Sequence, residues 1–192
     1  MFITHTDSRT NWAIRTLAYD NVYPTNAVLD AAKHGDVVAL DVALSVYDAK
    51  VADGVNMIVP DVCTTAVIYG QDDCLKFAIL RGNTWLAEMC ATLAYMGNLE
   101  MIQWIRNNDY RWNKLTCSYA ALGGHLDVLK WAMEKGCDWD SSAYYTAIKG
   151  GHIHIVQWLL SSGYPCDKWA RIKASQMNRL DIIHLLDCYN CP

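Results

Sequence analysis

Apolar and polar positions recur along the chain with the spacing of short amphipathic helices. Within residues 126–135, apolar side chains such as Leu129 and Met133 return every three or four positions, which gathers them on one helical face. Residues 116–122 form another such stretch. The glycines at 123 and 124 end it, because glycine readily takes the left-handed backbone of a helix stop. Almost no stretch has the period of two that marks a strand. The pattern therefore predicts pairs of short helices and few strands.

The helix pair repeats with a step of 27 residues. The run Ala-Ala-Leu-Gly-Gly-His-Leu-Asp-Val-Leu-Lys-Trp at 120–131 returns as Ala-Ile-Lys-Gly-Gly-His-Ile-His-Ile-Val-Gln-Trp at 147–158. Several columns share this register: Gly70, Gly97, Gly124, Gly151 and then Asn178; Trp104, Trp131 and Trp158; Cys63, Cys90 and Cys117. Asn178 fits the glycine column because asparagine tolerates a left-handed backbone. Internal repeats of this kind predict a stacked repeat protein.

The repeats can be placed along most of the chain. An earlier copy of the turn, His-Gly-Asp, stands at 34–36, with eight extra residues before the next repeat. We therefore expect an N-terminal capping segment at 1–25, with an amphipathic helix over 10–19. Six repeats follow at 26–60, 61–87, 88–114, 115–141, 142–168 and 169–192. Asn113, Asp140 and Asp167 are expected to cap the first helices that follow them.

The repeat resembles the ankyrin repeat. Residues 124–140, Gly-His-Leu-Asp-Val-Leu-Lys-Trp-Ala-Met-Glu-Lys-Gly-Cys-Asp-Trp-Asp, follow the second half of the family's pattern almost position by position, and the resemblance covers 26–192. The family's usual period is 33, and the missing residues fall where it builds a β-hairpin finger. The resemblance implies an all-α, ankyrin-like α-solenoid of about six helix-turn-helix repeats, mostly without fingers. The longer link at 48–60 is the place where a finger could stand. Short, Trp-rich repeats of this kind resemble those of giant viruses of amoebae.

Composition and charge limit the partners. The chain has 192 residues, 53% of them apolar and 19% charged, with a net charge of −4. Nucleic-acid binding needs clustered Lys and Arg, which the sequence lacks, so no nucleic acid is expected. No stretch reaches the roughly 18 apolar residues of a membrane span, and residues 1–10 lack the layout of a signal peptide. We therefore expect an intracellular, cytoplasmic protein without membrane contact, in the host cytoplasm if the viral resemblance holds.

The cysteines are explained by the repeat. Cys63, Cys90 and Cys117 occupy a core position of the family, where a free thiol behaves as a small apolar side chain. One repeat, about 10 Å, is expected between neighbours of this column, which is too far for a disulfide. Cys188 and Cys191 form the only close pair, and a zinc site would need a second pair of ligands. We therefore expect neither disulfides nor a metal.

Catalytic chemistry is not visible in the sequence. His125 and His152 belong to the Gly-His turn of the family, where histidine helps to fix the turn. No arrangement of nucleophile, base and acid stands out, and there is no phosphate loop or dinucleotide motif. We therefore expect no enzyme, no catalytic residue and no cofactor.

A binding surface is predicted where the repeat leaves residues unexplained. The family resemblance implies that the ends of the first helices, just before the turn, line the concave side of the stack. In this sequence the middle of that row is apolar, and an exposed apolar strip with polar rims is typical of a protein-binding surface. The predicted partner-binding residues are Lys33, His34, Ile68, Tyr69, Tyr95, Met96, Leu122, Lys149 and Met177. The alternative is that these side chains fill gaps between neighbouring first helices.

The sequence therefore predicts a non-enzymatic module that binds a protein partner on the concave face by burying Tyr69, Tyr95 and Met96. If the viral resemblance holds, that partner is a host protein. One alternative is a structural or self-associating protein, such as a virion component, because the final helix carries Ile182, Leu186 and other apolar residues that could form a homodimer. A second alternative is an enzyme with an unrecognised site, which a deep polar pocket would support.

Overall fold

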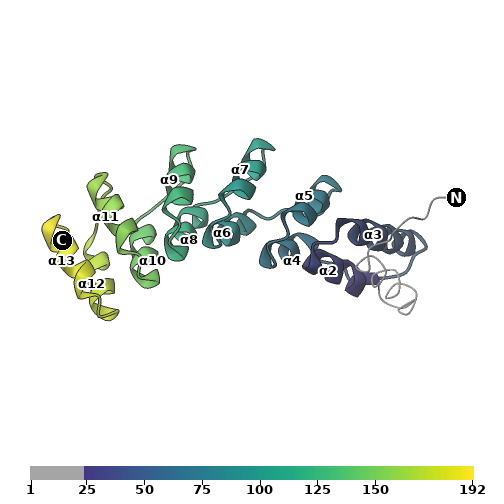
Figure 1. Ribbon diagram of the computed structural model, residues 1–192, viewed down its shortest axis with the longest axis horizontal. Coiled ribbons are helices and arrows are strands. Elements are labelled where there is room, and N and C mark those ends of the chain that lie inside the picture. The colour runs from purple at the N-terminus through teal and green to yellow at the C-terminus, as the bar shows by residue number, and fades with distance from the viewer. Residues whose placement is uncertain (1–23) are drawn as a thin grey trace. The chain divides into compact units, whose positions relative to one another are not determined.

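The computed structural model describes residues 24–192, and this part of the chain contains twelve helices and no strand (Figure 1). The helices are α2 (Pro24–His34), α3 (Val37–Ala52), α4 (Val62–Ile68), α5 (Asp72–Leu80), α6 (Ala87–Tyr95), α7 (Leu99–Asn107), α8 (Leu115–Gly123), α9 (Leu126–Glu134), α10 (Ser142–Gly150), α11 (Ile153–Ser161), α12 (Lys168–Gln176) and α13 (Leu180–Cys188). They follow one another as six pairs of a first and a second helix, which confirms the predicted all-α array. The predicted helix over 10–19 lies outside the described residues.

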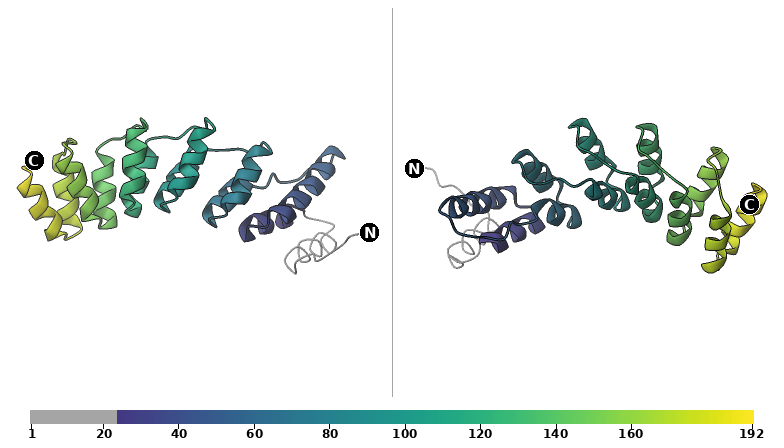
Figure 2. Two further views of the ribbon diagram at one scale, coloured as in Figure 1. Left: turned by 45° about the horizontal axis from the view of Figure 1, so that its top comes forward. Right: turned by 180° about the vertical axis from the view of Figure 1, so that it is seen from behind.

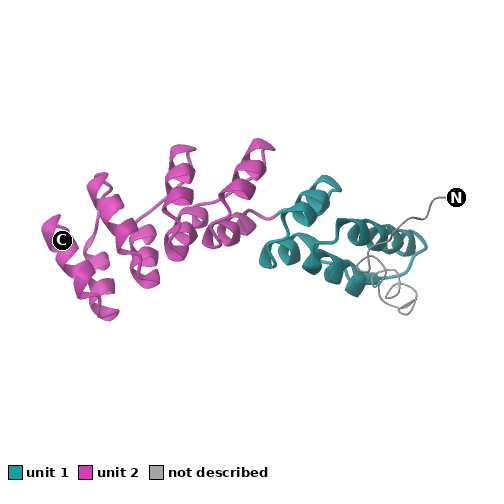
Figure 3. Cartoon of the chain, viewed as in Figure 1, with its two compact units in different colours: residues 1–85 teal, residues 86–192 magenta. Residues whose placement is uncertain are grey.

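The chain divides into two compact units, residues 1–85 and 86–192 (Figure 3). Unit 1 contains α2–α5, and unit 2 contains α6–α13. In unit 1, α2 packs on α4 and α3 packs on α5. In unit 2, the first helices α6, α8, α10 and α12 pack in succession, and α11 packs on α13 (Figure 2). First helices therefore stack on first helices within each unit.

Apolar side chains at matching repeat positions are buried and stabilise the stack of helices in each unit. Ala66, Ala120 and Ala147 are fully buried on first helices, where their small side chains let neighbouring helices approach closely. On second helices, Leu75 and Leu129 share one position and are also fully buried. Burying one such leucine contributes about 1.5–3 kcal/mol before entropy is subtracted. Because each helix pair contacts only its neighbours, stability accumulates over the stack.

The turns and caps follow the sequence pattern. Gly124 and Gly151 end α8 and α10 with φ values of 85° and 83°. Asn178 has a φ of 53° in the same column, as predicted. Asp167 is the N-cap of α12, as predicted, and accepts a hydrogen bond from Trp169 N (2.9 Å). The other two cap predictions are off by one residue, because the N-caps of α8 and α10 are Lys114 and Ser141. Asn113 and Asp140 stand just before them and accept from Leu115 N (3.0 Å) and Ser142 N (2.9 Å).

The link at 48–60, where a finger could stand, holds none. α3 continues to Ala52, and no strand follows it before α4. The extra residues lengthen a helix, which brings Asp48 within 3.1 Å of the Arg81 guanidinium at the end of α5. Arg81 also pairs with Asp41 of α3. The longer helix is therefore fixed to its neighbour by charge as well as by apolar packing.

The expectation that the chain has no disulfide is wrong. Cys63, Cys90 and Cys117 are buried free thiols, as predicted, and burial raises the pKa of Cys63 to about 11. Cys166 and Cys191, however, are joined by a disulfide. The expected separation of about 10 Å applies to residues of one repeat column. Cys166 and Cys191 belong to different columns, in the loops that follow α11 and α13, and their Cα atoms lie 5.8 Å apart.

Candidate partner-binding groove

A groove of about 720 Å³ lies at the C-terminal ends of the first helices in unit 2. It is lined by residues of α6, α8 and α10 and of the turns that follow them: Tyr95, Met96, Tyr119, Leu122, Gly123, His125, Lys149, Gly150 and His152. The structure thus brings together four of the predicted partner-binding residues: Tyr95, Met96, Leu122 and Lys149. No acidic side chain is part of the lining.

Two histidines fix the spacing of the helices that form the groove. The Nε2 atom of His125 donates a hydrogen bond to the Tyr95 carbonyl oxygen (3.0 Å), because a carbonyl can only accept. His152 donates in the same way to the Leu122 carbonyl oxygen (3.0 Å). Each bond links a turn to the end of the preceding first helix, so we call these two contacts the histidine latches. They also satisfy carbonyl groups that a helix end leaves without a partner.

Each histidine latch depends on a glycine two residues before it. A Cβ atom at Gly123 would collide with the Tyr95 carbonyl oxygen and the His125 ring. A Cβ atom at Gly150 would collide with the Leu122 carbonyl oxygen and the His152 ring. The equivalent positions in the neighbouring repeats carry Met96 and Met177. The groove is therefore hollow over α8 and α10 because the latches exclude side chains there.

The apolar walls of the groove face solvent. Tyr95, Met96 and Tyr119 have exposed fractions of 50%, 42% and 39%. Leu122 is half-buried, and Lys149 is exposed. The three large side chains therefore leave apolar area available for contact.

The other predicted binding residues lie outside the groove. Lys33, His34, Ile68 and Tyr69 belong to unit 1 and are all exposed. The Lys33 ammonium lies 5.1 Å from the centroid of the Tyr69 ring, a distance that allows a cation–π interaction. Met177 follows α12 in unit 2 and is exposed, but it does not line the groove.

Tyr119 was not predicted from the sequence, and neither were the four glycine and histidine residues of the groove, Gly123, His125, Gly150 and His152. Tyr119 lies three residues before Leu122, so helical spacing would have placed it on the same face. The glycines were interpreted as helix stops, and the histidines as parts of the turn. Both interpretations are consistent with the structure, but neither takes into account that a glycine has no side chain and therefore leaves space beside it.

Among the described residues, no group of three or more His, Cys, Asp or Glu side chains lies close enough together to hold a metal ion. Cys188 is a free, exposed thiol, whereas Cys191 is in the disulfide. The two groove histidines use Nε2 for their latches. The lining offers aromatic, aliphatic, imidazole and ammonium groups for contact.

Stacked helix pairs joined by repeated turns define the chain as a helical repeat protein. A family model described as ankyrin repeats (3 copies) matches residues 117–191. The fold is similar to that in the crystal structure of the human ASB11 ankyrin repeat domain, with a TM-score of 0.64, 17% identity, and coverage of 86% of this chain and 84% of that one. A comparison with curated proteins gives no match. Residues 117–191 thus match ankyrin repeats, and the described chain shares the fold of a solved ankyrin repeat domain, which confirms the resemblance seen in the sequence.

This result sets the broad functional class. Ankyrin repeats are generally protein–protein interaction modules, and their fold is a known non-enzymatic scaffold for such contacts. In the residues that the structure describes, no helix is both long and apolar enough to cross a membrane.

Proposed function

We propose that this chain is a protein–protein interaction module that binds a segment of a partner in the groove of unit 2. The observation that carries the proposal is the exposure of Tyr95, Met96 and Tyr119 around a hollow that the histidine latches keep open. Aromatic side chains at the centre of an interface commonly supply most of the binding energy. If the resemblance to the repeats of giant amoeba viruses holds, the partner is a host protein.

The groove favours binding because it is formed before the partner arrives. The latches hydrogen-bond the ends of α6 and α8, and the alanines between the first helices are fully buried. The walls therefore need little ordering when a partner binds, and a preformed surface loses less free energy on association. Each buried aromatic ring can remove about 150–250 Å² from water.

A comparison of two surface variants tests the site. The groove variant carries Tyr95→Ala, Met96→Ala and Tyr119→Ala. The matched control carries Val38→Ala and Leu80→Ala, which remove exposed apolar side chains from the second helices of unit 1. Each protein is used to capture partners from a cell lysate, after circular dichroism has shown equal helical content. A partner that binds the parent and the control but not the groove variant would support the proposal, whereas a partner kept by the groove variant would place the site elsewhere.

Self-association through α13 is the second candidate function. Ile182 and Leu186 are buried within unit 2, so these residues are already used in packing. Leu180 and Tyr189 remain exposed near the two ends of α13, at 62% and 43%. If α13 pairs two copies, sedimentation should show a dimer that Leu180→Asp abolishes. A monomer at all concentrations would exclude this function.

A further inference from the structure

The charges of unit 2 are segregated between its two layers of helices. The first helices α6, α8, α10 and α12 carry four basic residues, Lys149, Lys168, Arg171 and Lys173, and one acid, Glu88. The second helices α7, α9, α11 and α13 carry five acids and two basic residues. The whole chain has a net charge of −4. A basic first-helix layer on an acidic protein therefore needs an explanation beyond solubility.

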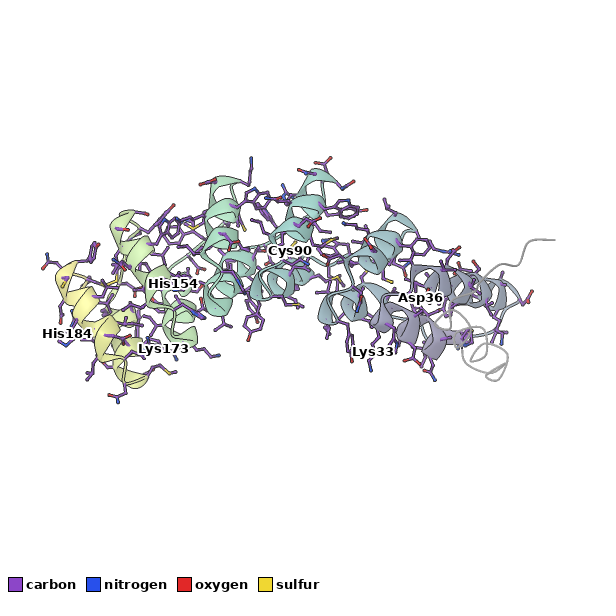
Figure 4. The ribbon with its side chains drawn as sticks, in the orientation of Figure 1. Lys33, Asp36, Cys90, His154, Lys173 and His184 are labelled. Carbon is purple, nitrogen blue, oxygen red and sulfur yellow. A yellow bond between two sulfur atoms is a disulfide. The ribbon has the colours of Figure 1, made fainter. Side chains whose placement is uncertain are left out.

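Two of these basic residues are available to a partner. Arg171 pairs with Asp187 at 2.5 Å, and the Lys168 ammonium lies 5.6 Å from the centroid of the Trp169 ring. Neither Lys149, which is exposed, nor Lys173, which is half-buried, has an ion-pair or ring partner in the described part of the chain. Lys149 lines the groove, and Lys173 lies on α12 of the first-helix layer (Figure 4).

The repeat register places both lysines on the face that forms the groove. Lys149 occupies the position that Tyr95 and Leu122 occupy in earlier repeats, and Lys173 occupies the position of Tyr119. The face thus changes along the stack from aromatic and aliphatic side chains on α6 and α8 to ammonium groups on α10 and α12. The carbonyl oxygens of Tyr95 and Leu122, which would repel an anion, are covered by the histidine latches.

Resting on the proposed function, we infer that the partner segment is a peptide that combines an apolar anchor with acidic side chains. The anchor packs against Tyr95, Met96, Tyr119 and Leu122, and carboxylates meet Lys149 and Lys173. With about 10 Å per repeat and about 3.3 Å per residue in an extended chain, the two carboxylates lie about three residues apart. The first of them lies about four or five residues from the anchor by the same estimate.

A peptide selection tests this inference on the full chain. A displayed library of random peptides, about 12 residues long to exceed the estimated span, is selected against the parent protein. Binding of the enriched peptides is then measured for three variants: Lys149→Glu with Lys173→Glu, Tyr95→Ala with Tyr119→Ala, and the control Lys135→Glu. Lys135 is exposed and follows α9 in the second-helix layer.

The expected peptides carry an aromatic or aliphatic anchor with acids on one side of it. Their affinity should fall about tenfold or more with Lys149→Glu and Lys173→Glu, because attraction becomes repulsion of like charges. Their affinity should also weaken with added salt, since the Debye length is about 8 Å at 0.15 M. The Lys135→Glu control should change affinity less than twofold, within the small effect of a distant surface charge.

The remaining outcomes separate the two proposals. Peptides that lose binding to the Tyr95→Ala and Tyr119→Ala variant but show no acidic preference would overturn this inference and leave the groove as the site. Peptides that bind the double-lysine variant and the double-tyrosine variant as tightly as the parent would overturn the proposed function. A library that yields no binder to the parent would count against both.

Discussion

Unit 1 and unit 2 connect their successive first helices at the same place in the repeat, but with different side chains. In unit 1, the Gln71 amide donates from Nε2 to the Lys33 carbonyl oxygen (3.2 Å). In unit 2, His125 and His152 donate to the corresponding carbonyl oxygens at 3.0 Å. The acceptor in each case lies two residues before the glycine of the preceding turn. The repeat position therefore determines that a donor is present, and the side chain can vary.

The choice of donor changes the surface around it. The imidazole ring is wide and rigid, and it requires Gly123 or Gly150 two residues before it. The flexible chain of Gln71 imposes no such demand, and Tyr69 stands two residues before it with a full, exposed side chain. A histidine latch thus creates a hollow, whereas a glutamine latch leaves the same place filled. The groove of unit 2 is a consequence of how that unit fixes its helices.

Reduction of the Cys166–Cys191 disulfide should have the largest effect, and it should act only on unit 2. The bond closes a loop with a sequence separation of 25, and a cross-link of this length stabilises by about 3 kcal/mol in the chain-entropy model. It encloses α12 and α13, which bury few side chains: Ala170, Ala174, Ile182 and Leu186. Hydrogen exchange with and without a reductant should show protection lost in these two helices and kept in α2–α5.

The exposed free thiol provides the control for that experiment. Cys188→Ser should leave the protection of α12 and α13 unchanged, because Cys188 is not in the disulfide. Equal loss of protection in both units on reduction would contradict the assignment of the effect to the cross-link. A full count of eight free thiols in the untreated, unfolded protein would contradict the disulfide itself.

Gly150→Ala tests whether the latch excludes a side chain. The new methyl group would collide with the Leu122 carbonyl oxygen and the His152 ring, so we expect the free energy of unfolding to fall by about 1–3 kcal/mol. Gly163→Asn is the matched control, because the space around Gly163 is open and Asn190 already takes a left-handed backbone at the same repeat position. Its change in the free energy of unfolding should stay within about 0.5 kcal/mol. Equal losses in a urea titration would refute the crowding argument.

His152→Ala removes the latch itself. The Leu122 carbonyl oxygen loses its side-chain donor, and we expect a loss of about 1–2 kcal/mol in the free energy of unfolding. Because Gln71 makes the equivalent bond in unit 1, His152→Gln should recover more than half of that loss. Chemical denaturation of the three proteins provides the comparison. If the Gln and Ala variants lose the same amount, the donor is not what matters at this position.

One repeat position carries different side chains in the two units: it is Tyr144 in unit 2 and Cys63 in unit 1. The contribution of Tyr144 to stability is expected to depend on pH. Tyr144 is fully buried, and burial raises its pKa to about 12; its hydroxyl donates to the Tyr164 carbonyl oxygen (2.8 Å). Since the folded pKa exceeds the unfolded value of about 10, the contribution to stability is complete below pH ~10 and is lost as the pH rises toward 12. Tyr144→Phe should cost about 1 kcal/mol at pH 7.

The test for Tyr144 is whether the loss in the free energy of unfolding caused by Tyr144→Phe changes with pH. Urea unfolding at pH 7 and at a pH near 11 should show the parent approaching the stability of Tyr144→Phe at the higher pH, because only the parent loses the tyrosine contribution. A cost that does not change with pH would show that Tyr144 does not titrate during unfolding in this range. The buried thiols, such as Cys63 with its pKa of about 11, are present in both proteins and cancel in the comparison.

The helices and turns could be predicted because each is specified within one repeat. The spacing of Leu129 and Met133, the glycine stops and the capping carboxylates act over a few residues, and the 27-residue register shows them several times. Asn178 in a left-handed turn is an example: the column predicts it, and the structure gives a φ of 53°. Local rules that repeat are therefore easily recognised in the sequence.

Features that depend on unlike positions were harder to predict. The disulfide joins Cys166 to Cys191, two residues that no single column relates. The groove depends on Gly123 and Gly150, whose importance comes from the ring that each one accommodates. The long link was named as a place where a finger could stand, but part of it continues α3, where Asp48 pairs with Arg81. Contacts between different repeat positions need three-dimensional distances, which the register does not contain.

The smallest expected effect is that of Gln71→Ala, at about 0.5 kcal/mol, because the bond is exposed to solvent and such bonds contribute little net stability. Replacing Gln71 by histidine is more informative than removing its hydrogen bond. Gln71→His alone should not form a histidine latch, since Tyr69 stands where the histidine ring needs a glycine. Tyr69→Gly combined with Gln71→His should be more stable than the sum of the two single changes predicts, by about 0.5–1 kcal/mol in a double-mutant cycle. Simple additivity in urea denaturation would show that the Gly-x-His spacing does not by itself produce the latch.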